Sequence, residues 1–132
     1  MIQHPNCENK RVLLAEDNAI NQMVSVSLLK KLGFVVDVAE NGNEALKSLE
    51  QNHYDLVLMD CQMPVMDGYE ATRMIRDPSS PVLNHAVPIV AMTANAMSGE
   101  REKCLAAGMN DYTTKPVKIE VLKKVLSQVL HN

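Results

Sequence analysis

Short apolar runs alternate along the chain with segments whose apolar residues recur at helical spacing, and this alternation constrains the fold more than any other feature. The runs cover residues 12–15, 35–39, 56–59, 87–92 and 112–114. The helical patterns cover residues 20–32, 42–52, 68–76, 98–107 and 117–129, and Gly33 and Gly108 supply C-terminal stops for two of them. Strands that alternate with helices predict a parallel sheet with helices on both faces.

Composition also predicts the order of the strands. Runs 12–15, 56–59 and 87–92 are almost wholly apolar, as expected for central parallel strands that are covered on both faces. The second run contains Asp37, and the fifth run is short and polar, so these two suit the edges. We therefore expect an α/β fold, a flavodoxin-like doubly wound (βα)5 unit whose parallel five-stranded sheet has the order 2-1-3-4-5.

A length of 132 residues with 46% hydrophobic residues fits one domain with a substantial core. We expect residues 10–132 to form it, and residues 1–9, which are polar, to be a linker or a disordered N-terminus. A polar start and an abrupt end favour a fragment of a longer chain over a complete protein.

Charge and composition exclude several classes of protein. The net charge of −3 argues against a nucleic-acid binder, which usually carries a basic face. Three cysteines without metal-ligand spacing favour free thiols in a reducing compartment. The sequence has no apolar run of about 20 residues and no signal-peptide pattern, so we expect a cytoplasmic domain that makes no membrane contact of its own.

Acidic residues follow the two strands at which the strand order reverses, where ligands bind in such sheets. Glu16 and Asp17 come after the first strand, and Asp60 comes after the third. Three converging carboxylates repel one another, and a hard cation such as Mg²⁺ relieves the repulsion. Thr93 and Lys115 follow the fourth and fifth strands, at the same edge. Together these groups predict a phosphoryl-transfer site in which an aspartate is the nucleophile.

The same residues resemble the response-regulator receiver domain. The resemblance lies in Glu16-Asp17-Asn18, in the stretch from Met59 to Gly68, in Thr93-Ala94 and in Lys115-Pro116, and it covers residues 10–130. The longer stretches 14–22 and 60–72 are most similar to the receivers of hybrid sensor histidine kinases.

The resemblance implies a role for each residue at the acidic edge. Asp60 is implied as the phosphoacceptor. Glu16 and Asp17 are implied as the acidic pair that holds Mg²⁺, for which Mn²⁺ could substitute, with the backbone carbonyl of Gln62 as a further ligand. Lys115 would contact the phosphoryl group and the Asp60 carboxylate.

A second group of residues is implied in the switch that follows phosphorylation. Thr93 would bond the phosphoryl oxygen and move, and Tyr112 would change rotamer with it. Pro116 matches a position that often follows a cis peptide bond. Gln62 and Asn95 match positions that tune the access of water, so the rate of dephosphorylation stays open.

Two features outside these motifs have ordinary explanations. Residues 76–86 form a longer connection than expected, which we interpret as a tolerated surface insertion. Cys61, beside Asp60, could be a redox sensor, but we prefer a small buried hydrophobic residue.

The implied function is that of a phosphoacceptor in a two-component system or phosphorelay. A phosphohistidine on a histidine kinase domain or a histidine phosphotransfer protein would be the donor, and a phosphotransfer domain could also be the recipient. Ala19, Ile20 and Met23 on the first helix would form the docking patch, unless Ile20 and Met23 face the core. We expect the domain to be a monomer or weak dimer. It would catalyse its own phosphorylation and dephosphorylation without being a turnover enzyme. A parent hybrid kinase would carry the transferase activity.

Other functions remain as alternatives. A stand-alone single-domain response regulator would carry the same residues. An aspartate-nucleophile phosphatase needs a second Asp two residues after the nucleophile, where this chain has Gln62. A flavin or nucleotide binder needs a phosphate-binding loop after the first strand, where this chain is acidic. A degenerate receiver used only for protein binding would not need the complete set of site residues.

Overall fold

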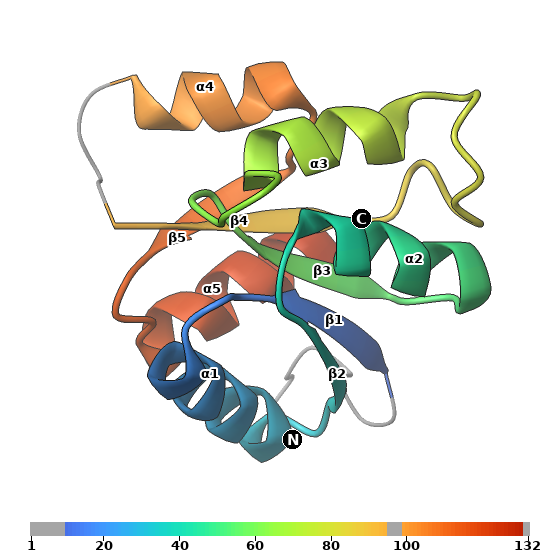
Figure 1. The fold of residues 1–132 in the computed structure, drawn as a ribbon. Helices are drawn as coiled ribbons and strands as arrows, with labels where there is room; N and C mark the ends of the chain where they lie inside the picture. The colour runs from blue at the N-terminus through green and yellow to red at the C-terminus, as the bar shows by residue number, and fades with distance from the viewer. Residues whose placement is uncertain (1–9, 95–98, 131–132) are drawn as a thin grey trace.

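Five parallel strands form the centre of the molecule (Figure 1). The computed structural model describes residues 10–94 and 99–130. The strands are β1 (Arg11–Ala15), β2 (Val35–Ala39), β3 (Leu56–Asp60), β4 (Ile89–Thr93) and β5 (Asp111–Thr114). Their order in the sheet is β2-β1-β3-β4-β5, with every neighbouring pair parallel. The strand order predicted from composition is therefore confirmed.

A helix follows each strand. The helices are α1 (Ala19–Lys31), α2 (Gly42–Gln51), α3 (Gly68–Arg76), α4 (Glu100–Ala107) and α5 (Ile119–Leu130). The predicted boundaries agree to within two residues. Two differences of two residues have a physical reason. Strand β4 begins after Pro88, which has no N–H to donate to a neighbouring strand, and Val117 is buried but lies ahead of α5. Residue 98, the expected start of α4, lies outside the described residues.

Side-chain caps fix where three of the helices begin. The side chain of Asn18 accepts a hydrogen bond from the backbone of Asn21, and Asn41 and Asp67 make the equivalent bond at α2 and α3. Each cap satisfies one backbone N–H that has no partner in the first turn of a helix. The loops that lead to these caps are short after β1 and β2, whereas residues 61–67 separate β3 from α3.

The sheet separates two hydrophobic cores. Helices α2, α3 and α4 cover one face, with Leu49, Ile75 and Cys104 among the buried side chains. Helices α1 and α5 cover the other face, where Leu29 and Leu126 pack. Because both faces are covered, β3 and β4 are buried along their whole length, whereas β2 is partly exposed at the edge.

The long connection after α3 is anchored to the protein, so the interpretation as a simple surface insertion is incomplete. The Arg76 guanidinium donates to the backbone oxygens of Gly108, His85 and Val87 and to the side chain of Asn110. Val82 is 5% exposed in the core beside α2 and α3. The extra residues thus lie over the edge of a core and are held by one partly buried cation.

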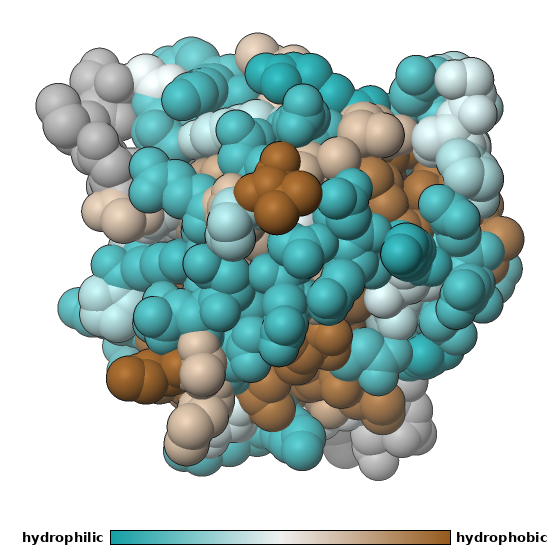
Figure 2. All heavy atoms as spheres, in the orientation of Figure 1, coloured by the Kyte–Doolittle hydropathy of each residue, from teal (hydrophilic) through white to brown (hydrophobic). Residues whose placement is uncertain are grey.

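The surface facing the viewer is largely hydrophilic, but apolar side chains reach it in the lower half, over α1 and β2 (Figure 2). The exposed apolar residues of these two elements are Ile20, Met23, Val24, Val35 and Val38. Within the described part of the chain, no helix is long and apolar enough to cross a membrane.

Candidate functional site

The carboxyl ends of β1 and β3 bring the three predicted acidic residues together. Carboxylate oxygens of Glu16, Asp17 and Asp60 lie within 4.8 Å of one another. Glu16 and Asp60 are 1% and 2% exposed, whereas Asp17 is exposed at the rim. The convergence expected from the strand order is confirmed, and it concentrates negative charge where little water can screen it.

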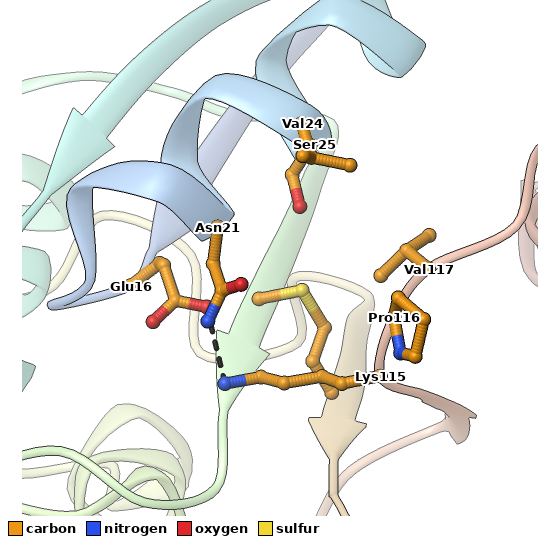
Figure 3. A pocket seen from close by; sticks show the side chains of 8 residues that line it. Glu16, Asn21, Val24, Ser25, Lys115, Pro116 and Val117 are labelled. Atoms are coloured by element: carbon orange, nitrogen blue, oxygen red, sulfur yellow. Dashed lines mark ion pairs between the residues drawn. The ribbon is translucent and has the colours of Figure 1, made fainter.

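Lys115 enters this cluster from the end of β5. Its Nζ lies 2.7 Å from Asp60 Oδ2 and 3.1 Å from Glu16 Oε1. Burial lowers the pKa of Lys115, but the hydrogen bonds and charges of Asp60 and Glu16 outweigh it, so the pKa is raised. Lys115 therefore stays cationic in the site. Figure 3 shows Lys115 and Glu16 beside a small cavity of about 40 Å³ between α1 and the segment 115–117 that precedes α5.

The buried environment of Glu16 disfavours its charged form. Its Oε2 accepts a hydrogen bond from the backbone of Asn18 at 3.1 Å. Its buried Oε1 forms the ion pair with Lys115 but no well-aligned hydrogen bond within the described residues. Burial, together with the hydrogen bond and charge of the neighbouring Asp60, raises the pKa of Glu16 to about 7. A cation bound beside Glu16 Oε1 would stabilise the negative charge of this carboxylate.

The loop after β3 holds Asp60 in place. The backbone N–H of Gln62 donates to Asp60 Oδ1 at 3.0 Å, so both carboxylate oxygens have a donor. A Cβ at Gly68 would lie 2.3 Å from the backbone oxygen of Asp60, so only glycine permits this approach of α3. Val65 has a φ of 71°, a region that β-branched residues rarely occupy, and no sequence signal predicted it.

Thr93 is the last residue of β4, the strand beside β3, and its side chain is buried at the edge of the site. Its Oγ1 donates to Glu100 Oε1 at 3.3 Å, and the hydroxyl of Tyr69 also bonds that oxygen. Sequence reasoning gave no role to either residue: Glu100 lies outside the quoted motifs, and Tyr69 belongs to the stretch 60–72 but does not follow a strand. Together they connect the predicted switch residue to α3 and α4.

Tyr112 and Asn95 complete the predicted set. Tyr112 is half-buried against the core of the α4 face and lines an open groove of about 420 Å³ with residues of α4 and α5. Asn95 lies outside the described residues. The peptide bond between Lys115 and Pro116 is cis, as the resemblance implied.

The predicted docking patch is exposed. Ile20 and Met23 are 71% and 72% exposed, and Ala19 is exposed beside them. The alternative, that Ile20 and Met23 face the core, is wrong. Helix α1 instead buries Ser25 and Leu29, and leaves apolar side chains at its N-terminal end next to the acidic cluster.

Cys61 is buried, as we expected from the sequence. It is 2% exposed, and burial raises its pKa to about 12. Its thiol is therefore protonated and belongs to the core of the α4 face, although it follows Asp60 directly in the chain.

Comparisons with known proteins agree with this geometry. The family model "Response regulator receiver domain" matches residues 12–127. Hybrid signal transduction histidine kinase B of Dictyostelium discoideum is 45% identical over 131 residues, which cover 89% of this chain and 7% of that protein. The chain spans only 6% to 17% of the length of the curated relatives that it matches.

Two solved structures have the same fold. One is the receiver domain of a sensor histidine kinase from Pseudomonas aeruginosa with a magnesium ion in the active site cleft; it is 45% identical, with a TM-score of 0.83 over 94% of this chain and 99% of that one. The other is the complex of the Saccharomyces cerevisiae histidine phosphotransfer protein Ypd1 with the receiver domain of Ssk1, at 34% identity and a TM-score of 0.80 over 97% of this chain and 91% of that one. The family match over most of the chain, on a sheet that carries the acidic cluster and Lys115 at its carboxyl edge, shows that this chain belongs to the response regulator receiver domain family.

Proposed function

We propose that the chain accepts a phosphoryl group on Asp60 from a phosphohistidine. The observation that carries this proposal is the setting of Asp60: it is buried, its Oδ2 bonds Lys115, its Oδ1 bonds the backbone of Gln62, and two further carboxylates lie beside it. A lysine and a fixed backbone donor neutralise the charge that gathers on phosphoryl oxygens during transfer.

The acidic cluster fits a magnesium ion. The donor set is entirely oxygen, which Mg²⁺ prefers, and Glu16 Oε1 is a buried acceptor whose neighbouring cation, Lys115, is shared with Asp60. Asp17 lines an open hollow of about 460 Å³ through which a hydrated ion could enter. Glu16, Asp17, Asp60 and the backbone carbonyl of Gln62 would hold it. A bound Mg²⁺, or Mn²⁺ in its place, would neutralise phosphate oxygens and favour in-line transfer.

The chain supplies the nucleophile and a cation. An oxygen of Asp60 attacks the phosphorus, a phosphorus–oxygen bond forms, and the phosphorus–nitrogen bond breaks with its electron pair returning to the donor imidazole. Lys115 holds the carboxylate oriented and pairs with the incoming negative charge. Thr93, with Tyr112, responds to the new phosphoryl group and moves the α4 side of the domain. Gln62 has no carboxyl group, so the site lacks the second acid of an aspartate-nucleophile phosphatase.

We assign the domain to a hybrid histidine kinase in the cytoplasm, with residues 1–9 as its linker and residues 10–132 as the receiver. Curated relatives named as hybrid kinases support this context. A histidine kinase domain and a histidine phosphotransfer protein would be the partners, with the exposed end of α1 as their docking patch. The Ypd1 complex supports that kind of partner. The domain itself would be a monomer or weak dimer.

Incubation with acetyl phosphate and Mg²⁺ tests the proposal. Intact mass should increase by one phosphoryl group, the adduct should be labile to base, and Asp60→Asn should abolish it. Asp55→Asn, at the opposite end of β3, is the matched control and should be modified normally. If neither acetyl phosphate nor a phosphorylated histidine phosphotransfer protein labels Asp60, the proposal is overturned.

A further inference from the structure

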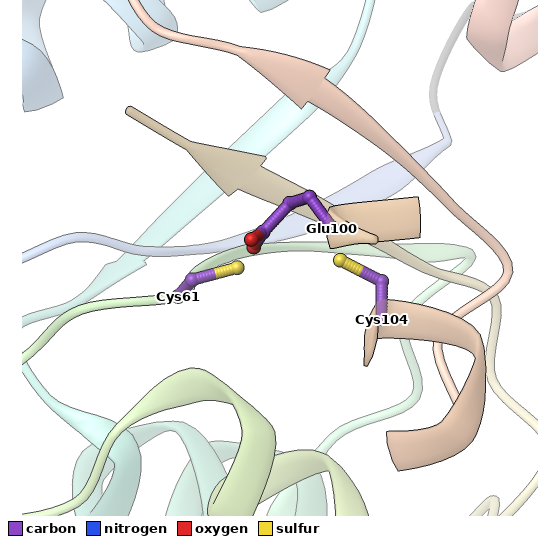
Figure 4. A group of neighbouring side chains, drawn as sticks. All are labelled: Cys61, Glu100 and Cys104. Carbon is purple, nitrogen blue, oxygen red and sulfur yellow. The ribbon is translucent and has the colours of Figure 1, made fainter. Parts of the chain in front are cut away.

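A second group of donor atoms lies on the other side of β3. The sulfur atoms of Cys61 and Cys104 and a carboxylate oxygen of Glu100 all lie within 4.8 Å of one another. Figure 4 shows the two sulfurs and the carboxylate pointing toward one another, from the end of β3 and from α4. Asp60 and Cys61 are neighbours in the chain, but Cys61 packs in the core of the α4 face, so this cluster is separate from the acidic cluster.

Sequence separation and helical spacing explain how the cluster forms. Glu100 and Cys104 are four residues apart on α4, so they share one face of the helix. That face packs toward Cys61, which is 2% exposed, and Cys104 is 1% exposed. Both cysteines are free thiols. The Tyr69 hydroxyl bonds Glu100, so a fourth polar group faces the cluster.

We propose that Cys61, Glu100 and Cys104 form a binding site for a zinc ion. Two sulfur donors and one carboxylate match the ligands that Zn²⁺ takes, with a water molecule or the Tyr69 oxygen for the fourth position. The oxygen-only cluster at Asp60 suits Mg²⁺ instead, so the two sites differ in ligand softness and would select different ions.

Charge and access are compatible with this site. Binding of one Zn²⁺ displaces one proton from each thiol to solvent and leaves two thiolates on the ion. The thiolates and the Glu100 carboxylate carry one negative charge more than the ion neutralises. Lys103, whose Nζ lies 4.6 Å from the centre of the Tyr69 ring, is placed to offset it. Cys61, Tyr69 and Lys103 line the open hollow of about 460 Å³, which gives an ion a route to the site.

Cobalt substitution tests the site directly. The chain with Cys7→Ser, which leaves only the two clustered thiols, is titrated with Co²⁺ in excess Mg²⁺, so that the carboxylate cluster at Asp60 is occupied. We expect a thiolate-to-cobalt charge-transfer absorption that saturates at one equivalent and is displaced by one equivalent of Zn²⁺. Cys104→Ser and Cys61→Ser should each abolish it, and circular dichroism checks that each variant is folded.

A matched pair of glutamate variants separates a ligand from a general charge effect. Glu100→Gln should weaken Co²⁺ binding about ten-fold or more, whereas Glu102→Gln, exposed on the same helix, should not change it. Three results would overturn the proposal: an absorption that survives Cys104→Ser, displacement of Co²⁺ by further Mg²⁺, or conversion of the two thiols to a disulfide without any metal-dependent absorption.

Discussion

The ammonium of Lys115 lies 2.7 Å from Oδ2 of Asp60, although the two residues are 55 positions apart in the chain. The contact joins the end of β5 to the end of β3 across the intervening strand β4. The same ammonium also pairs with Glu16, so one cation balances two buried carboxylates. This sharing makes the site sensitive to the loss of a single charge.

Replacement of Lys115 by methionine should therefore affect stability and chemistry together. Without Mg²⁺, Lys115→Met leaves two buried carboxylates unpaired and should lower the free energy of unfolding by about 3 kcal/mol. With Mg²⁺, it should slow phosphorylation by acetyl phosphate about 100-fold, because one charge stabilising the transferred group is lost. Urea denaturation and mass spectrometry measure the two effects. Lys118→Met, at an exposed position nearby, should change neither; equal effects in both variants would refute the assigned role.

The raised pKa of Glu16 predicts a pH dependence of stability in Mg²⁺-free buffer. Its pKa is about 7 in the folded protein, against 4.5 ordinarily, so the unfolded chain releases this proton first as pH rises. The folded state then binds more protons, and stability should decline between about pH 4.5 and pH 7, by about 3 kcal/mol in total. The decline should be complete above pH 7 and absent below pH 4.5.

Glu16→Gln should remove this contribution, which is measured as the difference between the wild-type and variant unfolding curves across the pH range. Glu50→Gln, exposed on α2, is the control and should retain the wild-type decline. A variant curve parallel to the wild type at every pH would show that Glu16 titrates normally.

The exposed end of α1 should be required for transfer from a protein donor but not from a small one. Ile20→Asp puts a charge into the apolar docking patch and should slow transfer from a histidine phosphotransfer protein about ten-fold or more. Phosphorylation by acetyl phosphate should not change, and the free energy of unfolding should stay within about 0.5 kcal/mol. Leu105→Asp, 40% exposed on α4 across the sheet, is the matched control. Full-rate transfer to the Ile20 variant would exclude this patch.

Arg76 should be a major determinant of stability outside the site. Arg76→Ala removes bonds to three backbone oxygens and to Asn110, and it loosens the connection between α3 and β4. We expect a loss of about 3 kcal/mol in urea denaturation, since partly buried carbonyls lose a charged donor. Arg73→Ala, exposed on the same helix, should cost less than about 0.5 kcal/mol. Similar losses for both arginines would mean that the connection is not held in this way.

Several features of the site followed from local sequence alone. Apolar runs and helical periodicity set the elements, and Asp37 in the second run assigned that strand to an edge, as the sheet has it. Once the order was fixed, parallel geometry required Glu16, Asp60 and Lys115 to meet at one edge, because all strands end there. The exposure of Ile20 was left open, since the apolar residues of α1 are distributed around the helix and do not define one face.

Only the tertiary structure decided which side chains meet between elements. The bonds of Glu100 to Thr93 and Tyr69, the cluster of Cys61 with Cys104, and the anchoring of the long connection by Arg76 have no periodic signature. Periodicity reports which face of an element is buried, because it reflects the local backbone. It does not report how two faces pack against each other. That depends on the docking of α3 and α4 onto the sheet, which is set by the volumes and rotamers of residues far apart in the chain.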